Sequence, residues 1–334
     1  MLTLWQLRWN CWLRTNSAKT PEASGLYGKK KAASLVDSTQ NRLGVGGTRN
    51  SGVNSDGNLV FTKYDRRSLS YASTFDDPWK SAAISAIEAF TGKLTILRLI
   101  RKFEKRGAPQ GQAFWRACLD VMGIDLETPQ AQLDRIPKEG PVIVVANHPH
   151  GMVDGMIFAD LIGRVRSDYR ILTRSLLTAI DDVAGSYMIP VPFPHDKDAQ
   201  RKGVEMRAKA MKHLGEGGVV ALFPSGVVAS SDTWFGPAIE REWNVFTAKM
   251  IRKSGATVVP MRFPGQNSRA YQIANKVSPI LRQGLLLHEI VYSLNKPQAP
   301  IVGHPIPDET VQSFSDDPRG FMAWLRDHTL ALKD

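Results

Sequence analysis

The pattern of apolar and polar residues changes at Gly140. Beyond this glycine, short apolar runs of strand length alternate with longer runs of helical length. The short runs predict strands at Val142–Ala146, Tyr169–Leu172, Tyr187–Val191, Gly218–Phe223 and Thr257–Arg262. The longer runs predict helices at Met156–Gly163, Leu176–Val183, Asp198–Leu214 and Ile239–Ser254. This alternation predicts an α/β fold, in which a mixed, mostly parallel sheet is covered by helices.

A long amphipathic helix is predicted before the α/β pattern begins. From Trp79 to Arg106, apolar residues recur at intervals of three and four along one stripe, with a kink expected at Gly92. Basic residues accompany the second half of the stripe, as in helices that lie on an anionic membrane. The alternative is that the stripe packs on the domain and the charges face solvent. The stripe consists of Ile84, Ile87, Phe90, Leu94, Leu97, Ile100 and Phe103, and the basic residues are Arg98, Arg101, Lys102, Lys105 and Arg106.

Three regions follow from these patterns. We expect a disordered basic tail over residues 1–73, a helical membrane-docking region over residues 74–125, and an α/β domain over residues 126–334. The docking region includes a second helix from Gln112 to Met122. The segment from Lys19 to Asp65 is rich in Gly, Ser and Asn and lacks apolar periodicity, which predicts disorder. Residues 1–67 hold eleven Lys and Arg against four Asp and Glu, so +7 of the formal net charge of +11 belongs to the tail.

Composition and the remaining features of the tail argue against a disulfide-rich protein, a membrane-spanning protein and a signal peptide. A hydrophobic content of 43% and a charged content of 22% are ordinary for a globular protein. The two cysteines lack metal-type spacing, which fits a reducing compartment. No apolar stretch reaches the ~18–20 residues of a membrane-spanning helix, and polar residues interrupt any signal-peptide core. Trp5, Trp9 and Trp12 either form an aromatic stripe for a bilayer interface or belong to the disordered tail.

The first predicted strand leads directly into candidate chemistry. Val142–Ala146 is followed by Asn147, His148 and a proline, and Asp154 comes a few residues later in the start of a helix. A site at the carboxyl end of a parallel strand is typical of α/β folds. The imidazole and the carboxylate have the outline of a general base with its orienting acid. The alternative is a strand-ending turn in which Asp154 only caps the helix.

Three further fragments complete a pattern of four blocks. They are Met188–Pro192 followed by Arg201 and Lys202, Ala221–Gly226 (Ala-Leu-Phe-Pro-Ser-Gly), and Val258–Met261. Together with Asn147-His148, over residues 80–306, these blocks resemble the glycerolipid acyltransferase superfamily, typified by lysophosphatidic acid acyltransferases. The segment that begins at Asn147 resembles a subgroup with Asn-His-Pro-x-Gly-x-x-Asp-Gly. The ordered pair formed by the first block and Phe-Pro-x-Gly, about 75 residues apart, carries most of the resemblance.

The resemblance implies a reaction and a set of roles. A thioester donor, acyl-CoA or acyl-carrier protein, would pass its acyl group to the hydroxyl of a lysolipid, with no metal or other cofactor. His148 would take the hydroxyl proton, and Asp154 would hold the imidazole. Backbone N–H groups near Gly226 would stabilise the oxyanion. Such an enzyme would lie at the cytoplasmic face of the inner membrane as a peripheral protein. The implied substrate contacts are Asn147, His150, Gly151, Arg174, Phe223, Pro224, Ser225, Gly226 and Pro260.

The chain departs from the family pattern in three places. Five residues rather than four separate His148 from Asp154, so His150 is kept as an alternative base. Ser225 replaces the usual glutamate of Phe-Pro-Glu-Gly, and Pro192 replaces a frequent arginine. Both family positions are associated with binding glycerol phosphate. Arg174, Arg201 and Lys202 could compensate; otherwise the acceptor is a lyso-aminolipid, such as lyso-ornithine lipid, which has no phosphate.

Two other classes of function remain open from the sequence. A metal-dependent hydrolase would use His148, His150 and Asp154 as ligands, although the other histidines show no paired spacing. A non-catalytic membrane-binding module would need only the amphipathic helix. A nucleophilic role for Ser225 is disfavoured, because Phe-Pro-Ser-Gly lacks the spacing of a nucleophile elbow.

Overall fold

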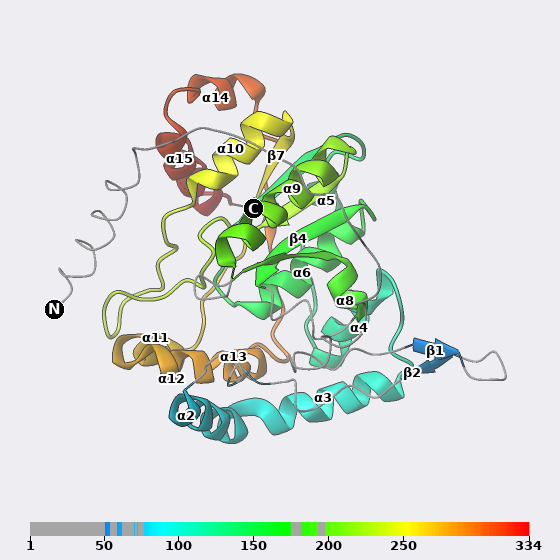
Figure 1. Cartoon of the computed structure of the whole chain (residues 1–334), viewed down its shortest axis with the longest axis vertical. Helices are drawn as coiled ribbons and strands as arrows, with labels where there is room; N and C mark the ends of the chain where they lie inside the picture. Colours follow the sequence, from blue (N-terminus) through cyan, green and yellow to red (C-terminus); the bar gives the residue numbers. More distant parts are fainter. Residues whose placement is uncertain are drawn as a thin grey trace, which may run out of the picture. The chain divides into compact units, whose positions relative to one another are not determined.

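A six-stranded sheet forms the framework of the protein (Figure 1). The computed structural model describes residues 51–53, 59–61, 70, 72, 77–174, 182–192 and 198–333. The strand order is β5-β4-β6-β3-β7-β8, with parallel pairing from β5 through β7 and an antiparallel β8 at the edge. The predicted α/β fold with a mostly parallel sheet is therefore confirmed. The strands are β3 (Val142–Ala146), β4 (Tyr169–Arg174), β5 (Met188–Val191), β6 (Val219–Leu222), β7 (Thr257–Arg262) and β8 (Ile301–Val302).

Helices cover both faces of the sheet, because its central strands are apolar on both sides. All five side chains of β3 are buried. Its Val142, Val144 and Ala146 belong to one hydrophobic core, and Ile143 and Val145 to the other. Fully burying one such aliphatic side chain contributes about 1.5–3 kcal/mol. The first core is closed by α4 (Ala113–Met122), α6 (Met152–Gly163) and α13 (Leu286–Tyr292), and the second by α9 (Ala199–Gly215), α10 (Val245–Ser254) and α15 (Pro318–Leu330).

The boundaries of two helices differ from the prediction for local reasons. Helix α6 begins four residues before the expected Met156, because Asp154 caps its first turn. Helix α10 begins at Val245 rather than Ile239, because the side chain of Asn244 caps it by accepting from the N–H of Phe246. The helix expected at Leu176–Val183 lies largely outside the described residues. Shorter helices complete the domain: α5 (Gln130–Leu133), α8 (Asp182–Ser186), α11 (Arg269–Val277), α12 (Pro279–Gly284) and α14 (Asp308–Ser313).

The predicted amphipathic helix is present and kinked. It consists of α2 (Pro78–Glu88), a π-helical turn η2 (Ala89–Lys93) and α3 (Leu94–Lys105), and the kink lies at Gly92 as expected. Its apolar stripe is divided. Ile84 and Phe103 are buried, whereas Phe90 is 91% exposed and Leu94 is 61% exposed. Part of the stripe therefore packs on the domain, and part of it faces outward.

Two strands occur in the segment that we expected to be disordered. β1 (Ser51–Val53) pairs antiparallel with β2 (Leu59–Phe61), which corrects the prediction for these residues. Three-residue strands are too short to give a visible period-2 pattern. The rest of the predicted tail, including its tryptophans, lies outside the described residues. Among the residues that the structure describes, no helix is both long and apolar enough to cross a membrane.

Candidate active site

The turn between β3 and α6 brings two histidines and one aspartate together. Gly151 precedes α6 with φ 74°, a conformation that glycine adopts at no steric cost. Asp154 then occupies the third position of the helix. Its Oδ2 accepts hydrogen bonds from the backbone N–H groups of His150 (2.7 Å) and Gly151 (3.1 Å). Asp154 therefore caps α6, as the alternative interpretation predicted.

The same carboxylate also contacts both imidazole rings. His148 Nδ1 lies 3.0 Å from Asp154 Oδ2, and His150 Nδ1 lies 3.0 Å from Asp154 Oδ1. Burial by itself raises the pKa of this fully buried carboxyl, but hydrogen bonds and charge from the two histidines outweigh it and hold the pKa below its usual range. An ionised carboxylate only accepts hydrogen bonds. Each ring therefore donates from Nδ1 and directs its Nε2 away from Asp154.

His148 is held on both sides of its backbone and along its ring. The ring stacks on Phe223, with centroids 3.9 Å apart. Its backbone oxygen accepts from the N–H of Ala229 (2.8 Å), and its own N–H donates to Glu240 Oε2 (3.1 Å). Nε2 of His148 makes no hydrogen bond to any described residue. The arrangement leaves one imidazole nitrogen for a reacting hydroxyl, which is the geometry of an oriented general base.

His150 occupies a more enclosed position than His148. Its side chain is 7% exposed, against 16% for His148. Its Nε2 lies against Gly265, where an added Cβ would come within 2.9 Å of that nitrogen. Gly265 also has φ +91°, so both its backbone and this close approach require glycine. The packing therefore favours Nε2 of His148, rather than Nε2 of His150, as the atom that contacts a substrate.

The Phe-Pro-Ser-Gly segment forms a tight turn beside His148. Gly226 has φ +66°, and its N–H donates to the backbone oxygen of Phe223 (2.9 Å). The N–H of Gly226 itself is thus used inside the turn, and oxyanion stabilisation by backbone N–H groups near Gly226 stays a prediction. Arg174 Nη2 donates to the backbone oxygen of Gly226 (3.1 Å), and Nη1 donates to that of Pro192 (3.4 Å). Arg174 thus joins the ends of neighbouring strands.

The other predicted contact residues have clear structural positions. Ser225 Oγ donates to the backbone oxygen of Val227 within the turn (3.0 Å), and the backbone oxygen of Pro224 accepts from Asn244 (3.0 Å). Pro260 is buried inside β7. An added Cβ on Gly303 would come within 2.8 Å of Pro260 Cγ, so these two residues are tightly packed. Pro260 therefore packs tightly inside the sheet, and its expected role as a substrate contact stays a prediction.

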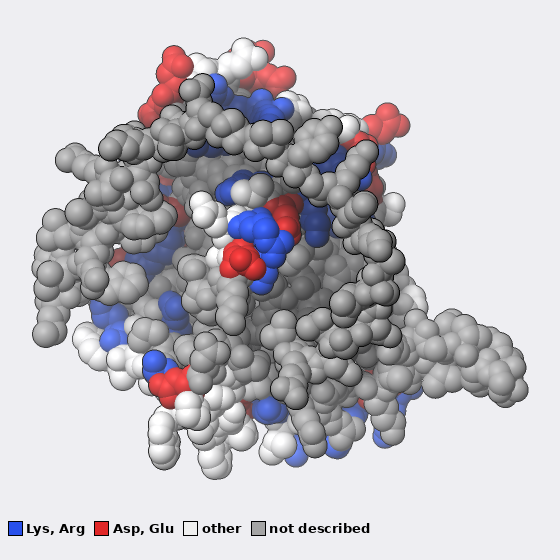
Figure 2. Space-filling view, in the orientation of Figure 1, with Lys and Arg blue, Asp and Glu red and all other residues white. Residues whose placement is uncertain are grey.

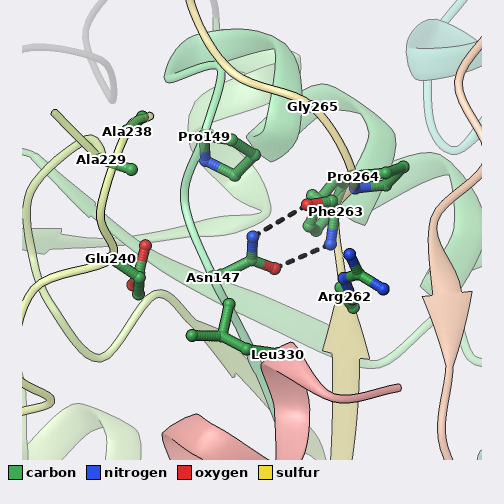
Figure 3. Close-up of a pocket in the computed structure, with 10 residues that line it drawn as sticks. All are labelled: Asn147, Pro149, Ala229, Ala238, Glu240, Arg262, Phe263, Pro264, Gly265 and Leu330. Atoms are coloured by element: carbon green, nitrogen blue, oxygen red, sulfur yellow. Dashed lines mark hydrogen bonds between the residues drawn. The ribbon is translucent and has the colours of Figure 1, made fainter. Parts of the chain in front are cut away.

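A pocket of about 280 Å³ opens between the ends of β3 and β7 (Figure 3). The amide of Asn147 forms part of its wall and exchanges two 2.8 Å hydrogen bonds with the backbone of Phe263. Glu240 and Arg262 also line this pocket, on either side of Asn147 in Figure 3. His148 is not among the residues that line it, and its ring stacks on Phe223. The sequence interpretation missed Glu240 and Arg262, since neither belongs to a recognisable motif.

The described residues contain no group of three or more His, Cys, Asp and Glu side chains arranged to hold a metal ion. In the cluster that the hydrolase alternative requires, both oxygens of Asp154 are hydrogen-bonded to ring nitrogens of His148 and His150. The two Nδ1 atoms are thus hydrogen-bonded to the carboxylate, and these groups do not point toward a common position that a metal ion could occupy.

Comparison with known proteins decides the family. A family model described as acyltransferase matches residues 95–288, which is more than half of the chain. The chain belongs to the acyltransferase family. Two proteins similar to this acyltransferase are both named lyso-glycine lipid O-acyltransferase. The protein from Phocaeicola vulgatus is 26% identical over 213 residues, covering 60% of this chain and 71% of the relative. The protein from Bacteroides thetaiotaomicron is 26% identical over 230 residues, covering 65% and 78%.

Proposed function

We propose that this acyltransferase transfers a fatty acyl group from a thioester donor to the hydroxyl of a lysolipid, in membrane lipid biosynthesis. The donor is acyl-CoA or acyl-carrier protein. The observation that carries the proposal is the buried Asp154 carboxylate on Nδ1 of His148, with Nε2 of that ring free of hydrogen bonds to described residues. The names of both relatives support the lysolipid acceptor.

The geometry supports general-base catalysis without an enzyme nucleophile. Nε2 of His148 takes the proton of the acceptor hydroxyl as the hydroxyl oxygen attacks the thioester carbonyl carbon. Asp154 stabilises the imidazolium that forms and fixes the ring tautomer. The tetrahedral intermediate then collapses, the carbon–sulfur bond breaks, and the imidazolium returns the proton to the leaving thiolate. The products are an ester and a free thiol, and His148 ends neutral.

The acceptor that we propose is a lyso-aminolipid rather than lysophosphatidic acid. A dianionic phosphate needs fixed cationic partners, and an arginine fork is the best of these. Ser225 and Pro192 offer no such charge. Arg174 donates to two backbone oxygens, and the exposed Arg201 forms ion pairs with Asp198 (3.3 Å) and Glu205 (2.6 Å) on its own helix. Two of the three cations considered as replacements for the family's phosphate site, Arg174 and Arg201, are thus engaged in structural contacts.

The pocket beside Asn147 is consistent with a small headgroup. Its volume of about 280 Å³ lies below the range of about 300–1,000 Å³ that is typical of drug-sized ligands. Arg262 is its cationic lining residue, and one guanidinium nitrogen, Nη1, donates to the backbone oxygen of Leu332. The remaining N–H groups of Arg262 suit the carboxylate of an amino-acid headgroup.

We further propose that the protein associates peripherally with the cytoplasmic face of the inner membrane through α2 and α3. Trp79, Phe90 and Leu94 expose most of their side chains there. The basic residues of α3 accompany them, and Figure 2 shows Lys and Arg side chains along the edge where Figure 1 draws α3. Exposed aromatic residues beside cations suit an anionic lipid surface.

Acylation of several acceptors by the purified protein tests the proposal. One acyl donor is supplied with lyso-glycine lipid, lyso-ornithine lipid or lysophosphatidic acid, and products are measured by mass spectrometry. We expect acylation of at least one lyso-aminolipid and weaker acylation of lysophosphatidic acid. Exclusive use of lysophosphatidic acid would contradict the acceptor assignment. Failure to acylate any lysolipid with either class of donor would contradict the proposed function.

A further inference from the structure

The connection between β6 and α10 exposes aromatic side chains to solvent. We define residues 227–243 as the aromatic loop. At its tip Phe235 is 81% exposed and Trp234 is 51% exposed. Ile239 of the loop and Val277 at the end of α11 are also exposed large apolar residues. In Figure 1 the loop descends beside α11. Clustered exposure of this kind marks an interaction surface, whereas single exposed apolar residues do not.

One face of α11 holds the tip in place. Arg269 donates from Nη1 to the backbone oxygen of Gly236 (2.6 Å). Gln272 Oε1 accepts from the N–H of Ser231 (2.7 Å), and Lys276 Nζ donates to the backbone oxygen of Asp232 (2.7 Å). The spacing of three and four residues places these side chains on the same face of the helix.

Contacts within the loop add to this support. Ser231 Oγ donates to the backbone oxygen of Thr233 (2.7 Å), and Thr233 Oγ1 accepts from the N–H of Gly236 (2.8 Å). Arg241 forms an ion pair with Asp232 (2.7 Å). The exposed aromatic pair is therefore presented by a fixed backbone. A fixed presentation reduces the conformational entropy that binding would otherwise cost.

Two residues at the base of the same loop form hydrogen bonds with the backbone of the proposed catalytic histidine. Ala229 donates its N–H to the backbone oxygen of His148, and Glu240 accepts the N–H of His148. Residues 229 and 240 flank the tip on its two sides along the chain. A surface that engages the tip is thereby connected to the backbone of the proposed general base through a single short loop.

The composition around the tip favours a lipid surface over a protein partner. The segment 268–284, which supports the loop, contains Arg269, Lys276 and Arg282 and no acidic residue. Asp232, the acidic residue next to the tip, is paired with Arg241. Tryptophan and phenylalanine beside cations are typical of side chains that enter a bilayer interface. A stable protein interface buries about 800 Å² on each partner, more than these four apolar side chains supply. The lipid bilayer also contains the acceptor of the proposed reaction.

We propose that the aromatic loop inserts Trp234 and Phe235 into the membrane and forms a contact separate from α2 and α3 that presents the lysolipid to His148. This inference rests on the proposed function for the identity of the acceptor. Because the contact is mainly apolar, its contribution to binding persists at high salt, unlike the contribution of the basic residues of α3.

A double variant with a matched control tests the inference. Trp234→Ser/Phe235→Ser is compared with Val204→Ser, which changes an exposed apolar residue of α9. Binding to vesicles of phosphatidylcholine and phosphatidylglycerol is measured by sedimentation at low and high salt. We expect the double variant to bind at least about tenfold more weakly at both salt concentrations, since two exposed aromatic side chains lose their apolar burial. The Val204 variant should bind like the wild type.

Activity measurements separate this inference from the proposed function. The double variant should acylate a vesicle-embedded lysolipid about tenfold more slowly, but a short-chain, monomeric lysolipid at the wild-type rate. Wild-type vesicle binding by the double variant would overturn the inference, as would an effect confined to self-association in solution. If the wild type acylates no lysolipid, the proposed function fails, while the binding experiment still decides whether the loop contacts lipid.

Discussion

Helices α6 and α3 lie on the same side of the sheet and differ in how they are buried. Eight of the twelve residues of α6 are buried, including Asp154 at its start. Only Ile96 and Phe103 are buried in α3, whose other side carries exposed basic residues. A helix enclosed on all sides fixes the direction of a carboxylate, and a one-sided helix leaves a charged surface available to a partner. We therefore propose that catalysis depends on α6 and membrane docking on α3.

A substitution of Asp154 should have the largest effect. Asp154→Asn keeps the size of the side chain but removes the charge that stabilises the imidazolium of His148. We expect acyl transfer to fall by about 10²–10⁴-fold, the usual value of general acid–base catalysis, with vesicle binding unchanged. Initial rates at saturating substrates measure the first effect, and sedimentation measures the second. A parallel loss of both would show that chemistry and docking are not separable.

A smaller effect is expected at His150, which donates from Nδ1 to Asp154 Oδ1. His150→Ala removes this hydrogen bond to a charged group, worth about 1.5–3 kcal/mol, so we expect roughly a 10–100-fold loss of kcat. His150→Asn keeps an N–H donor near the position of Nδ1 and should recover much of the rate. Steady-state kinetics compare the two variants. Equal damage by Ala and Asn would argue against the donor role, and damage as large as that of His148→Ala would make His150 the base.

Docking by α3 is the next property to test. Lys102→Gln/Lys105→Gln should weaken binding to anionic vesicles by about tenfold or more, because each basic residue near the surface contributes about 1 kcal/mol. The control Lys209→Gln/Lys253→Gln makes the same change of charge on α9 and α10. High salt should weaken wild-type binding and reduce the difference between the variants. Equal losses in both variants would indicate a general charge effect rather than a docking helix.

The smallest expected effect is the pH dependence of stability. The pKa of Asp154 is lower in the folded protein than its ordinary value, which is about 3.9 in an unfolded chain. The ionised carboxylate therefore stabilises the fold fully above the unfolded value, and this stability is lost as pH falls through the lower folded value. Urea unfolding should give a constant difference between wild type and Asp154→Asn from pH 7 to about pH 5. A difference that disappears within that range would indicate a raised pKa.

Much of the sheet was predictable from the sequence. Buried strands such as Val142–Ala146 form continuous β-branched runs, and this pattern indicates both the strand and its burial on two faces. Edge strand β8 has two residues and gives no such pattern. The start of α6 was misplaced because the apolar run begins at Met156, whereas the helix depends on the capping geometry of Gly151 and Asp154.

The candidate site was predictable where one segment supplies it or where the family pattern connects two segments, as with His148 and Phe223. His148, His150 and Asp154 lie within seven residues, so the sequence indicated their proximity. Glu240 reaches the backbone of His148 from 92 residues away, and a glutamate in a loop carries no local signal of such a contact. The use of the Gly226 N–H inside its own turn likewise depends on backbone geometry that a glycine in the sequence does not specify.

Acyl transfer by the wild type and His148→Ala, measured side by side, tests whether His148 is the general base of a lysolipid acyltransferase. Purified protein is incubated with a lyso-aminolipid and acyl-CoA or acyl-carrier protein, and the diacylated product is quantified by mass spectrometry over time. The wild type should form this product, and His148→Ala, checked to be folded under the assay conditions, should form it about 10²–10⁴-fold more slowly. Equal rates for the two proteins, or no product from the wild type with any lysolipid, would contradict the account.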